Sequence, residues 1–484
     1  MEMEVTIDTQ KIAHAQDLSK LAGVVEKFEM YSPENDLNEI RAAEIFAKVY
    51  CGRLRYNVTS GSYYWYNGKF WEKDLESVHA RALAKDYIRA MFIYAANLYN
   101  DELKVAMFEF YKRFNRKSNR DALIADAQTE LHIAEEDFDK DCNLFNVRNG
   151  TIDLRTFQIH DHIPDDLLTN YTDVEFIPGA RSELWEKFIS DVLPNDKALQ
   201  KYVQKALGYA MTGNPQLERM FVFYGATTRN GKSTLLNTVS HVLGSYAADT
   251  PAETLQRKEK RDSSAPSDDL ARLSKCRFVT VAEPDQLMIL DIALIKRFTG
   301  NDKITARRLY EKGFEYIPKF SLFMNTNYLP KVLDNTLFSS RRVEVVPFNR
   351  HFEEHEQDIT LKQKLRTEDS KSAVLAWLLE GLKEYKETGL TAPMAVNIET
   401  RRYEQQSDKL QQFIDSKLEE TEKPSITVKE CYEEYKKWCT SCGFSSEGVR
   451  TFSDKLRSKN LILDSATVDH KTKRNVINGY KLQD

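Results

Sequence analysis

The strongest pattern in this sequence is an alternation of apolar runs and amphipathic stretches between residues 220 and 348. Four apolar runs of strand length lie at 220–224, 277–283, 320–327 and 343–348, and stretches with helical periodicity alternate with them. Strands that alternate with helices are typical of a layered α/β fold. The pattern therefore predicts an α/β core in this part of the chain.

The first 183 residues follow a different pattern. Residues 75–140 have helical periodicity and contain no proline. Asn-Gly pairs at 67–68 and 149–150 each lie between apolar or aromatic runs. Because Asn-Gly is the strongest short-range signal for a two-residue β-hairpin, each pair predicts a hairpin. We expect an acidic segment over 1–40 and a domain of helices and hairpins over 41–183.

Helical periodicity returns at 184–212 and 358–388, and we group these helices with the α/β core in one domain over 184–395. A linker helix is expected over 396–418. Thr427 and Glu430 then form a capping box before an amphipathic helix.

A second helix and two strands, at 461–463 and 476–482, complete the C-terminal region over 396–484. The loop between these strands carries Lys471, Lys473 and Arg474. Two helices followed by a β-wing predict a winged helix-turn-helix domain that binds duplex DNA. A small domain that only packs against the rest of the chain is the alternative.

Composition narrows the classes of protein that fit. The chain has 484 residues, of which 41% are hydrophobic and 30% charged, and no apolar run approaches the roughly 20 residues that span a bilayer. The acidic N-terminus is not a secretory signal, and six scattered cysteines argue against a disulfide framework. We expect a soluble protein with no membrane contact, in the cytoplasm of a bacterium or of an infected host cell.

The net charge of −5 is unevenly distributed. Residues 1–50 hold ten acidic and five basic side chains, whereas residues 448–481 hold eight basic and three acidic ones. A basic C-terminal end fits contact with nucleic acid, and a solvated surface explains the charge equally well.

The first candidate site follows the strand at 220–224, which leads directly into a glycine-rich loop and then a helix. A phosphate loop of the Walker A type requires this context, because backbone N–H groups and the helix N-terminus surround the phosphates. Lys232 then reaches the β and γ oxygens, and the Ser233 hydroxyl ligates Mg²⁺. Five residues, rather than the usual four, separate the two glycines. The residues expected to bind nucleotide are Gly225, Thr228, Arg229, Asn230, Gly231, Lys232, Ser233 and Thr234.

The strands at 277–283 and 320–327 end in polar residues that suit ATP hydrolysis. Glu283 is the candidate acid that holds Mg²⁺ and polarises the attacking water, and Asp285 is an alternative. Asn327 is the candidate amide that orients water and senses the γ-phosphate.

Basic residues suggest two further contacts. Arg341 and Arg342 precede the last strand, where an arginine can project into a neighbouring subunit's nucleotide. We take Arg342 as this finger and leave Arg341 open. A hairpin over 304–317 carries Arg307, Arg308 and Lys312, which suit tracking of a DNA backbone. A hairpin that merely packs is the alternative.

Taken together, these segments resemble superfamily 3 helicases, specifically the helicase part of the poxvirus and phage/plasmid primase–helicases. The resemblance implies an AAA+-like P-loop core that uses ATP and Mg²⁺. It also implies a homo-oligomeric ring, commonly a hexamer, with single-stranded DNA in its channel. By the same resemblance Lys232 and Ser233 bind phosphate and metal, Glu283 is the catalytic acid, Asn327 senses phosphate, Arg342 is the finger and the 307–313 hairpin touches DNA. The segments that carry the resemblance are 225–234, 278–283, 293–307, 320–330 and 341–348, with 146–154, 164–166 and 202–213 upstream.

The implied function is that of an ATP-dependent replicative DNA helicase of a phage or mobile genetic element. Fewer than 150 residues precede the second Asn-Gly pair, and they contain no paired-carboxylate metal motif. Primase activity is therefore not expected, and a separate primase or other replication proteins are expected as partners. An origin-binding initiator and a DNA-translocating ATPase that does not separate strands are the alternatives.

Overall fold

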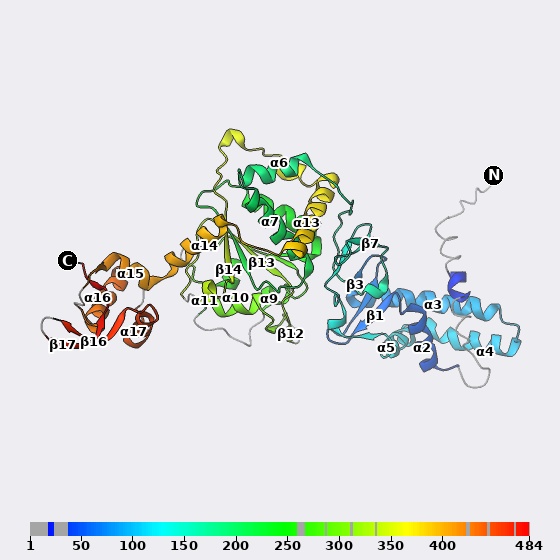
Figure 1. Cartoon of the computed structure of the whole chain (residues 1–484). Helices are drawn as coiled ribbons and strands as arrows, with labels where there is room; N and C mark the ends of the chain where they lie inside the picture. Colours follow the sequence, from blue (N-terminus) through cyan, green and yellow to red (C-terminus); the bar gives the residue numbers. More distant parts are fainter. Residues whose placement is uncertain are drawn as a thin grey trace.

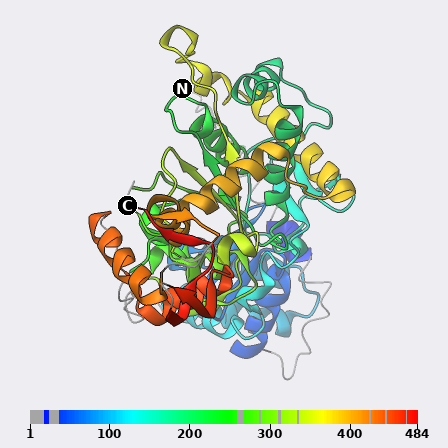
Figure 2. The same cartoon turned by 60° about the vertical axis from the view of Figure 1, so that its left-hand side comes forward.

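A computed structural model gives the structure of the chain, and three units follow one another along it (Figure 1). Figure 2 brings the C-terminal unit, in orange and red, to the front. Among the residues that the structure describes, given in the next sentence, no helix has both the length and the apolar character needed to cross a membrane. The residues described are 18–23, 37–258, 267–285, 288–309, 313–333, 336–422, 426–442, 446–468 and 471–483.

The N-terminal unit packs helices against one face of a four-stranded sheet, whose order is β3-β2-β1-β4. The hairpin predicted around Asn67-Gly68 is present, because β2 and β3 pair antiparallel up to Tyr66 and Trp71, but a longer loop over 67–70 replaces the expected two-residue turn. The helices are α2 (Glu39–Tyr50), α3 (Val78–Ala96), α4 (Asp101–Lys112) and α5 (Lys117–Ala127). The strands are β1 (Leu54–Asn57), β2 (Ser62–Tyr66), β3 (Trp71–Lys73) and β4 (His132–Ile133).

The second predicted hairpin is also present, and a third strand extends it, but its turn is Arg148-Asn149 rather than Asn149-Gly150, because Gly150 already pairs with Val147. The sheet contains β5 (Leu144–Val147), β6 (Gly150–Asp153) and β7 (Gln158–His160), all antiparallel. Gly150 has a φ of +150°, and a Cβ there would lie 2.4 Å from the carbonyl oxygen of His160. Only glycine therefore allows β7 to pair so closely with β6.

The central unit contains a fully parallel five-stranded sheet in the order β14-β8-β13-β10-β9. The sequence predicted four of these strands and missed β9, whose residues Ala-Ala-Asp-Thr are barely apolar. Since all five strands point the same way, the segments that follow them gather at one edge of the sheet. The strands are β8 (Met220–Tyr224), β9 (Ala247–Thr250), β10 (Phe278–Val281), β13 (Ser321–Thr326) and β14 (Val343–Pro347).

Side chains of β8 alternate between two hydrophobic clusters, because successive residues of a strand face opposite sides. Phe221 and Phe223 join the cluster under four helices, whereas Met220 and Val222 join the cluster on the other face. The first group of helices is α6 (Glu183–Val192), α7 (Lys197–Tyr209), α8 (Lys232–Leu243) and α13 (Glu368–Thr388). The other helices of this unit are α9 (Asp268–Ala271), α10 (Ile292–Thr299), α11 (Thr336–Ser339), α12 (Leu361–Lys364) and α14 (Met394–Ser407).

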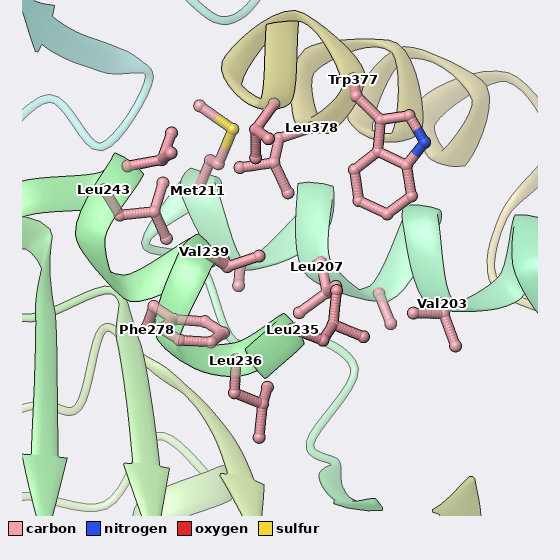
Figure 3. Close-up of a cluster of buried hydrophobic side chains, with 14 of the residues drawn as sticks. Val203, Leu207, Met211, Leu235, Leu236, Val239, Leu243, Phe278, Trp377 and Leu378 are labelled. Carbon is pink, nitrogen blue, oxygen red and sulfur yellow. The ribbon is translucent and has the colours of Figure 1, made fainter. Parts of the chain in front are cut away.

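The layer formed by α7, α8 and α13 is tightly packed. Figure 3 shows Leu207 of α7, Val239 of α8 and Leu378 of α13 meeting in one apolar cluster. A Cβ on Gly208 would lie 2.3 Å from the carbonyl oxygen of Leu378, so α7 and α13 approach backbone to backbone. The helices before and after the sheet thus form one support for α8.

The N-terminal unit contacts the central sheet at the edge where its strands begin. Lys275, just before β10, pairs with Glu135 at 2.8 Å. Lys319, just before β13, donates to the carbonyl oxygen of Asp139 at 2.9 Å. Both contacts lie at the opposite edge of the sheet from the phosphate loop.

The C-terminal unit has its own hydrophobic cluster, and it begins later than the sequence predicts. The expected linker helix is two helices, because Asp408 ends α14 and its side chain caps α15. The Thr400 hydroxyl of α14 accepts from the backbone N–H of Val345 in β14 at 2.9 Å, so α14 belongs with the central sheet. The predicted capping box at Thr427 and Glu430 is confirmed.

Two helices and a β-hairpin follow in the predicted order, with added strand pairing between β15 and β18. The prediction of a basic loop between the hairpin strands is wrong, because Lys471, Lys473 and Arg474 are paired residues of the second strand. The elements of the C-terminal unit are α15 (Lys409–Lys417), β15 (Leu418–Glu420), α16 (Val428–Ser441), α17 (Val449–Ser458), β16 (Ile462–Val468), β17 (Lys471–Ile477) and β18 (Tyr480–Leu482).

Candidate nucleotide-binding site

The glycine-rich loop lies between β8 and α8, where two glycines and an asparagine fix its shape. Gly231 has a φ of +83°, and a Cβ there would lie 2.3 Å from Cγ1 of Val192. A Cβ on Gly225 would lie 2.3 Å from Nδ2 of Asn230, which donates to the carbonyl oxygen of Thr227 at 2.6 Å. Arg229 adopts a left-handed conformation with a φ of +57°. The loop is therefore a compact turn despite its extra residue.

Lys232 is the first residue of α8 and is almost fully buried. Its Nζ donates to Oδ1 of Asn230 at 2.9 Å and to Oδ1 of Asn327 at 2.7 Å. Burial lowers the pKa of Lys232 to about 8, and the nearby Glu283 carboxylate partly opposes this shift. Both acceptors are neutral amides, so phosphate oxygens would give the ammonium stronger, charge-assisted hydrogen bonds.

The lowered pKa predicts that nucleotide binding weakens at alkaline pH. The ammonium is present below pH 8 and is lost as the pH rises through about 8, so the attraction to phosphate is lost in the same direction. The Kd for ATP should rise by up to about tenfold per pH unit above pH 8, measured by titration calorimetry between pH 7 and 9.5. Lys232→Arg is the control, because its guanidinium does not titrate in this range. An equally steep rise in that variant would contradict the assignment to Lys232.

A second part of the site forms where β10 and β13 end. The Ser233 hydroxyl accepts from Nδ2 of Asn325 at 2.9 Å. The backbone N–H of Asn327 donates to Oε1 of Glu283 at 3.3 Å. Together with the contact between Lys232 and Asn327, these bonds bring the loop, the acid and the amide into one cluster.

Two members of this cluster have the chemistry to hold Mg²⁺. The Ser233 hydroxyl and the exposed Glu283 carboxylate are oxygen donors, which Mg²⁺ prefers. Among the described residues, no group of three or more His, Cys, Asp or Glu side chains could hold a metal alone. Mg²⁺ typically takes one or two protein ligands and completes its shell with water and phosphate.

The sequence prediction missed Asn325 as a site residue. The signal was present, because Asn325 is a polar side chain within an otherwise apolar strand. The sequence pattern alone gave no reason to prefer Asn325 over Asn327. Only the pairing of β13 with β8 places the Asn325 side chain at Ser233.

The two candidate finger arginines lie at the other edge of the sheet, where β14 begins. Arg342 is bound within its own chain, with Nη2 2.6 Å from Oε2 of Glu218 and Nη1 2.9 Å from Oγ1 of Thr299. Arg341 is exposed, with a φ of +55°. The structure therefore engages Arg342 internally and presents Arg341 at the surface.

The predicted hairpin over 304–317 is confirmed as β11 (Ile304–Ala306) paired with β12 (Phe314–Tyr316). Arg307 and Arg308 are exposed, and the Arg308 guanidinium lies 5.9 Å from the centre of the Phe314 ring. Lys312 and Tyr310, at the expected tip, lie outside the described residues.

The predicted basic contacts of the C-terminal unit are only partly exposed. Lys473 is 3.6 Å from Glu430, and Arg474 is exposed. The side chain of Lys471 lies outside the described part of the chain.

Comparison with known families covers all three units. The profile described as "D5 N terminal like" matches residues 43–194, and the one described as "Poxvirus D5 protein-like" matches residues 405–480. A family of unknown function, DUF5906, matches residues 223–342. The two D5-like matches, near the two ends of the chain, support a poxvirus D5-like primase–helicase family for this protein. The resemblance predicted from the sequence is thus confirmed.

Individual viral proteins are also similar to this chain. Two proteins named "Putative helicase", from Acanthamoeba polyphaga mimivirus and Frog virus 3 (isolate Goorha), are each 26% identical to the chain. The matches cover 71% and 58% of this chain, but only 38% and 30% of the relatives. The chain thus spans well under half of the length of these relatives.

A solved structure of the NrS-1 C-terminal region, in its apo A form, aligns over 88% of this chain and 96% of its own. The TM-score is 0.49 and the sequence identity is 10%.

Proposed function

We propose that this chain is an ATP-dependent DNA helicase that acts in replication. The observation that carries the proposal is the cluster of Lys232, Ser233, Glu283 and Asn327 at the carboxyl edge of the parallel sheet. A buried lysine, a hydroxyl, a carboxylate and an amide are the groups that phosphoryl transfer to water requires. The viral relatives named as helicases support DNA unwinding as the use of that chemistry.

Each residue of the cluster has a distinct part in the proposed reaction. Lys232 neutralises charge on the β and γ phosphates. Ser233 and Glu283 would hold Mg²⁺, which would supply positive charge next to the transferred group. The Glu283 carboxylate accepts a proton from the attacking water. The Asn327 side chain accepts from Lys232, and the Asn327 backbone N–H donates to Glu283. A phosphate that binds the Lys232 ammonium would displace the Asn327 side chain, which is then free to bind the same phosphate.

The sheet order supports an AAA+-like core. The phosphate-loop strand β8 lies between β14 and β13, and β13 separates it from β10, which carries the acid. The amide of β13 is thereby placed between the loop and Glu283. The order of elements from α15 to β18 supports a winged helix-turn-helix fold for the C-terminal unit.

A ring of several subunits would bring the exposed Arg341 to a neighbour's nucleotide. Arg341 lines a cavity of about 500 Å³ beside β14, and Arg219 and Arg401 line the same cavity. Arg219 pairs with Glu344 of the same cavity at 2.9 Å, so the exposed Arg341 and Arg401 are the arginines that would attract an approaching phosphate. Since Arg342 is bound to Glu218 in its own chain, we assign the finger role, expected for Arg342, to Arg341 instead.

Mixing two inactive variants tests this assignment. Arg341→Ala should lower ATP turnover about a thousandfold, as removal of an arginine finger does. Adding Lys232→Ala protein should restore part of the activity, because each of its subunits supplies an intact Arg341 to an intact phosphate loop. Arg342→Ala is the matched control, and it should lower the melting temperature. No recovery at any mixing ratio, with assembly verified, would count against a finger in trans.

The C-terminal unit is proposed to bind duplex DNA through exposed cations such as Arg450 and Arg474. Removing residues 408–484 should weaken duplex binding and spare basal ATP hydrolysis, because the deleted unit has a separate hydrophobic cluster. Each lost phosphate contact should flatten the salt dependence by a slope of about 0.9. Filter binding at several salt concentrations measures both effects, and loss of hydrolysis in the truncated protein would contradict this division.

Strand displacement on a forked DNA duplex tests the helicase proposal itself. ATP and Mg²⁺ should release the labelled strand, and Lys232→Ala protein should not release it. Hydrolysis with movement along DNA but no strand release would favour a translocating ATPase. ATP-dependent assembly on duplex DNA without movement would favour an origin-binding initiator.

A further inference from the structure

A cavity of about 370 Å³ opens beside the phosphate loop, between α6 and the segment that follows β14. This volume lies within the roughly 300–1,000 Å³ range of small-molecule sites. The side chains relevant here are those of Ser190, Asp191, Asn195, Arg350, Phe352 and Glu356.

Both walls of this cavity are attached to the phosphate loop. On one side, the backbone N–H of Phe352 donates to the Arg229 carbonyl oxygen at 2.9 Å, and Nδ1 of His351 lies 2.8 Å from the Thr228 carbonyl oxygen. On the other side, α6 abuts the loop so closely that a Cβ on Gly231 would lie 2.3 Å from Val192. A group held between these walls is therefore next to any phosphate held by the loop.

The lining combines a flat aromatic surface with hydrogen-bonding groups. The Arg350 guanidinium lies 5.0 Å from the centre of the half-buried Phe352 ring, which leaves an aromatic and cationic surface suited to stacking on a base. Asp191 accepts from Lys187 at 2.5 Å and is a carboxylate acceptor at the cavity wall. The two acids of the lining are each paired with a cation, Asp191 with Lys187 and Glu356 with Arg350, so the lining has no net charge and suits an uncharged, flat group that bears hydroxyls.

We propose that this cavity holds the nucleoside part of the nucleotide, with Phe352 against a purine base and Asp191 accepting from a ribose hydroxyl. The inference rests on the proposed ATPase site and extends it to residues outside the phosphate loop. Phe352 and Asp191 then set the affinity for the nucleoside, whereas Lys232 and Glu283 act on the phosphates. Replacing Phe352 therefore raises the KM for ATP and leaves kcat unchanged.

Binding of ATP and of inorganic tripolyphosphate separates the two parts of the site. By titration calorimetry, Phe352→Ala should weaken ATP binding at least tenfold and leave tripolyphosphate binding unchanged, whereas Lys232→Ala should weaken both. Tyr99→Ala, at a fully exposed aromatic of the N-terminal unit, is the control and should change neither. Unchanged ATP affinity in a folded Phe352→Ala protein overturns the nucleoside assignment and leaves the phosphate loop standing. If the unaltered protein binds neither ligand, the ATPase proposal itself fails.

A second variant keeps the test independent of folding at Phe352. Asp191→Asn is isosteric and retains a hydrogen-bonding oxygen toward Lys187. It should reduce the preference for ATP over 2′,3′-dideoxy-ATP, because the amide oxygen is a weaker acceptor than the carboxylate. An unchanged preference means that Asp191 does not contact the ribose, and it overturns that part of the proposal.

Discussion

Lys232→Ala is expected to abolish ATP turnover while the protein remains folded. The side chain is buried at the start of α8, and its Nζ contacts only two amide oxygens among the bonds described for it, Asn230 and Asn327. Loss of a preorganised charge that acts on the transition state costs about 10²–10³-fold in turnover. Steady-state hydrolysis at saturating ATP measures the effect.

The control for this variant is Lys197→Ala, which removes an exposed lysine of α7 that contacts Gln200. Circular dichroism should give similar melting curves for both variants, because neither change opens a large apolar cavity. Steady-state hydrolysis by Lys232→Ala at the rate of the unaltered protein would refute the phosphate-loop assignment.

Glu283→Gln should retain ATP binding and lose hydrolysis. The substitution preserves the size of the side chain and an oxygen for the 3.3 Å contact with the Asn327 backbone, but an amide cannot act as a base. The expected loss in kcat is about 10²–10⁴-fold, the usual contribution of general base catalysis. Single-turnover hydrolysis and calorimetric ATP binding, measured on the same preparation, separate chemistry from affinity.

Asp285→Asn is the matched comparison for this acid. Asp285 lies two residues further along, and its described contact is a carbonyl that accepts from the Met288 backbone. The contact with Asn327 belongs to Glu283, so the change at Asp285 should affect turnover far less. A larger loss at Asp285 than at Glu283 would show that the catalytic acid has been placed at the wrong residue.

The elements that sequence reasoning predicted correctly depend on neighbouring residues. The two Asn-Gly hairpins, the capping box at Thr427 and the helix that starts at Lys232 each depend on residues within a few positions of one another. The helix cap at Asp408 is also a contact between neighbouring residues, although the prediction missed it. Its side chain caps α15 through the Gln411 backbone at 3.0 Å, and the prediction instead ran one helix through this point.

Contacts between distant residues were beyond such reasoning. Asn327 lies 95 residues from Lys232, and Asn325 lies 92 residues from Ser233. Each pair meets only because β13 is inserted beside β8 in the sheet. The sequence showed that each strand ends in a polar group, but strand order decides which of these groups touch.

Arg342 shows the difference between what local sequence predicts and what distant contacts decide. Its position before an apolar strand suggested a finger, and that position is shared with Arg341. The choice between them depends on Glu218, which lies 124 residues away and binds Arg342 where β8 and β14 begin. The cavity beside the phosphate loop is likewise built from α6 and the segment after β14, which no local pattern connects.

The sequence by itself located the glycine-rich loop and the strands that end in the acid and the amide, and it showed the resemblance to the poxvirus D5-like family. These features are encoded in short runs, because turn chemistry, apolar periodicity and helix capping act over a few residues. Only the tertiary structure decided which arginine is exposed, which asparagine meets Ser233 and where a cavity opens next to α6. Those outcomes depend on strand order and on packing between residues more than 90 positions apart, where local preferences have no influence.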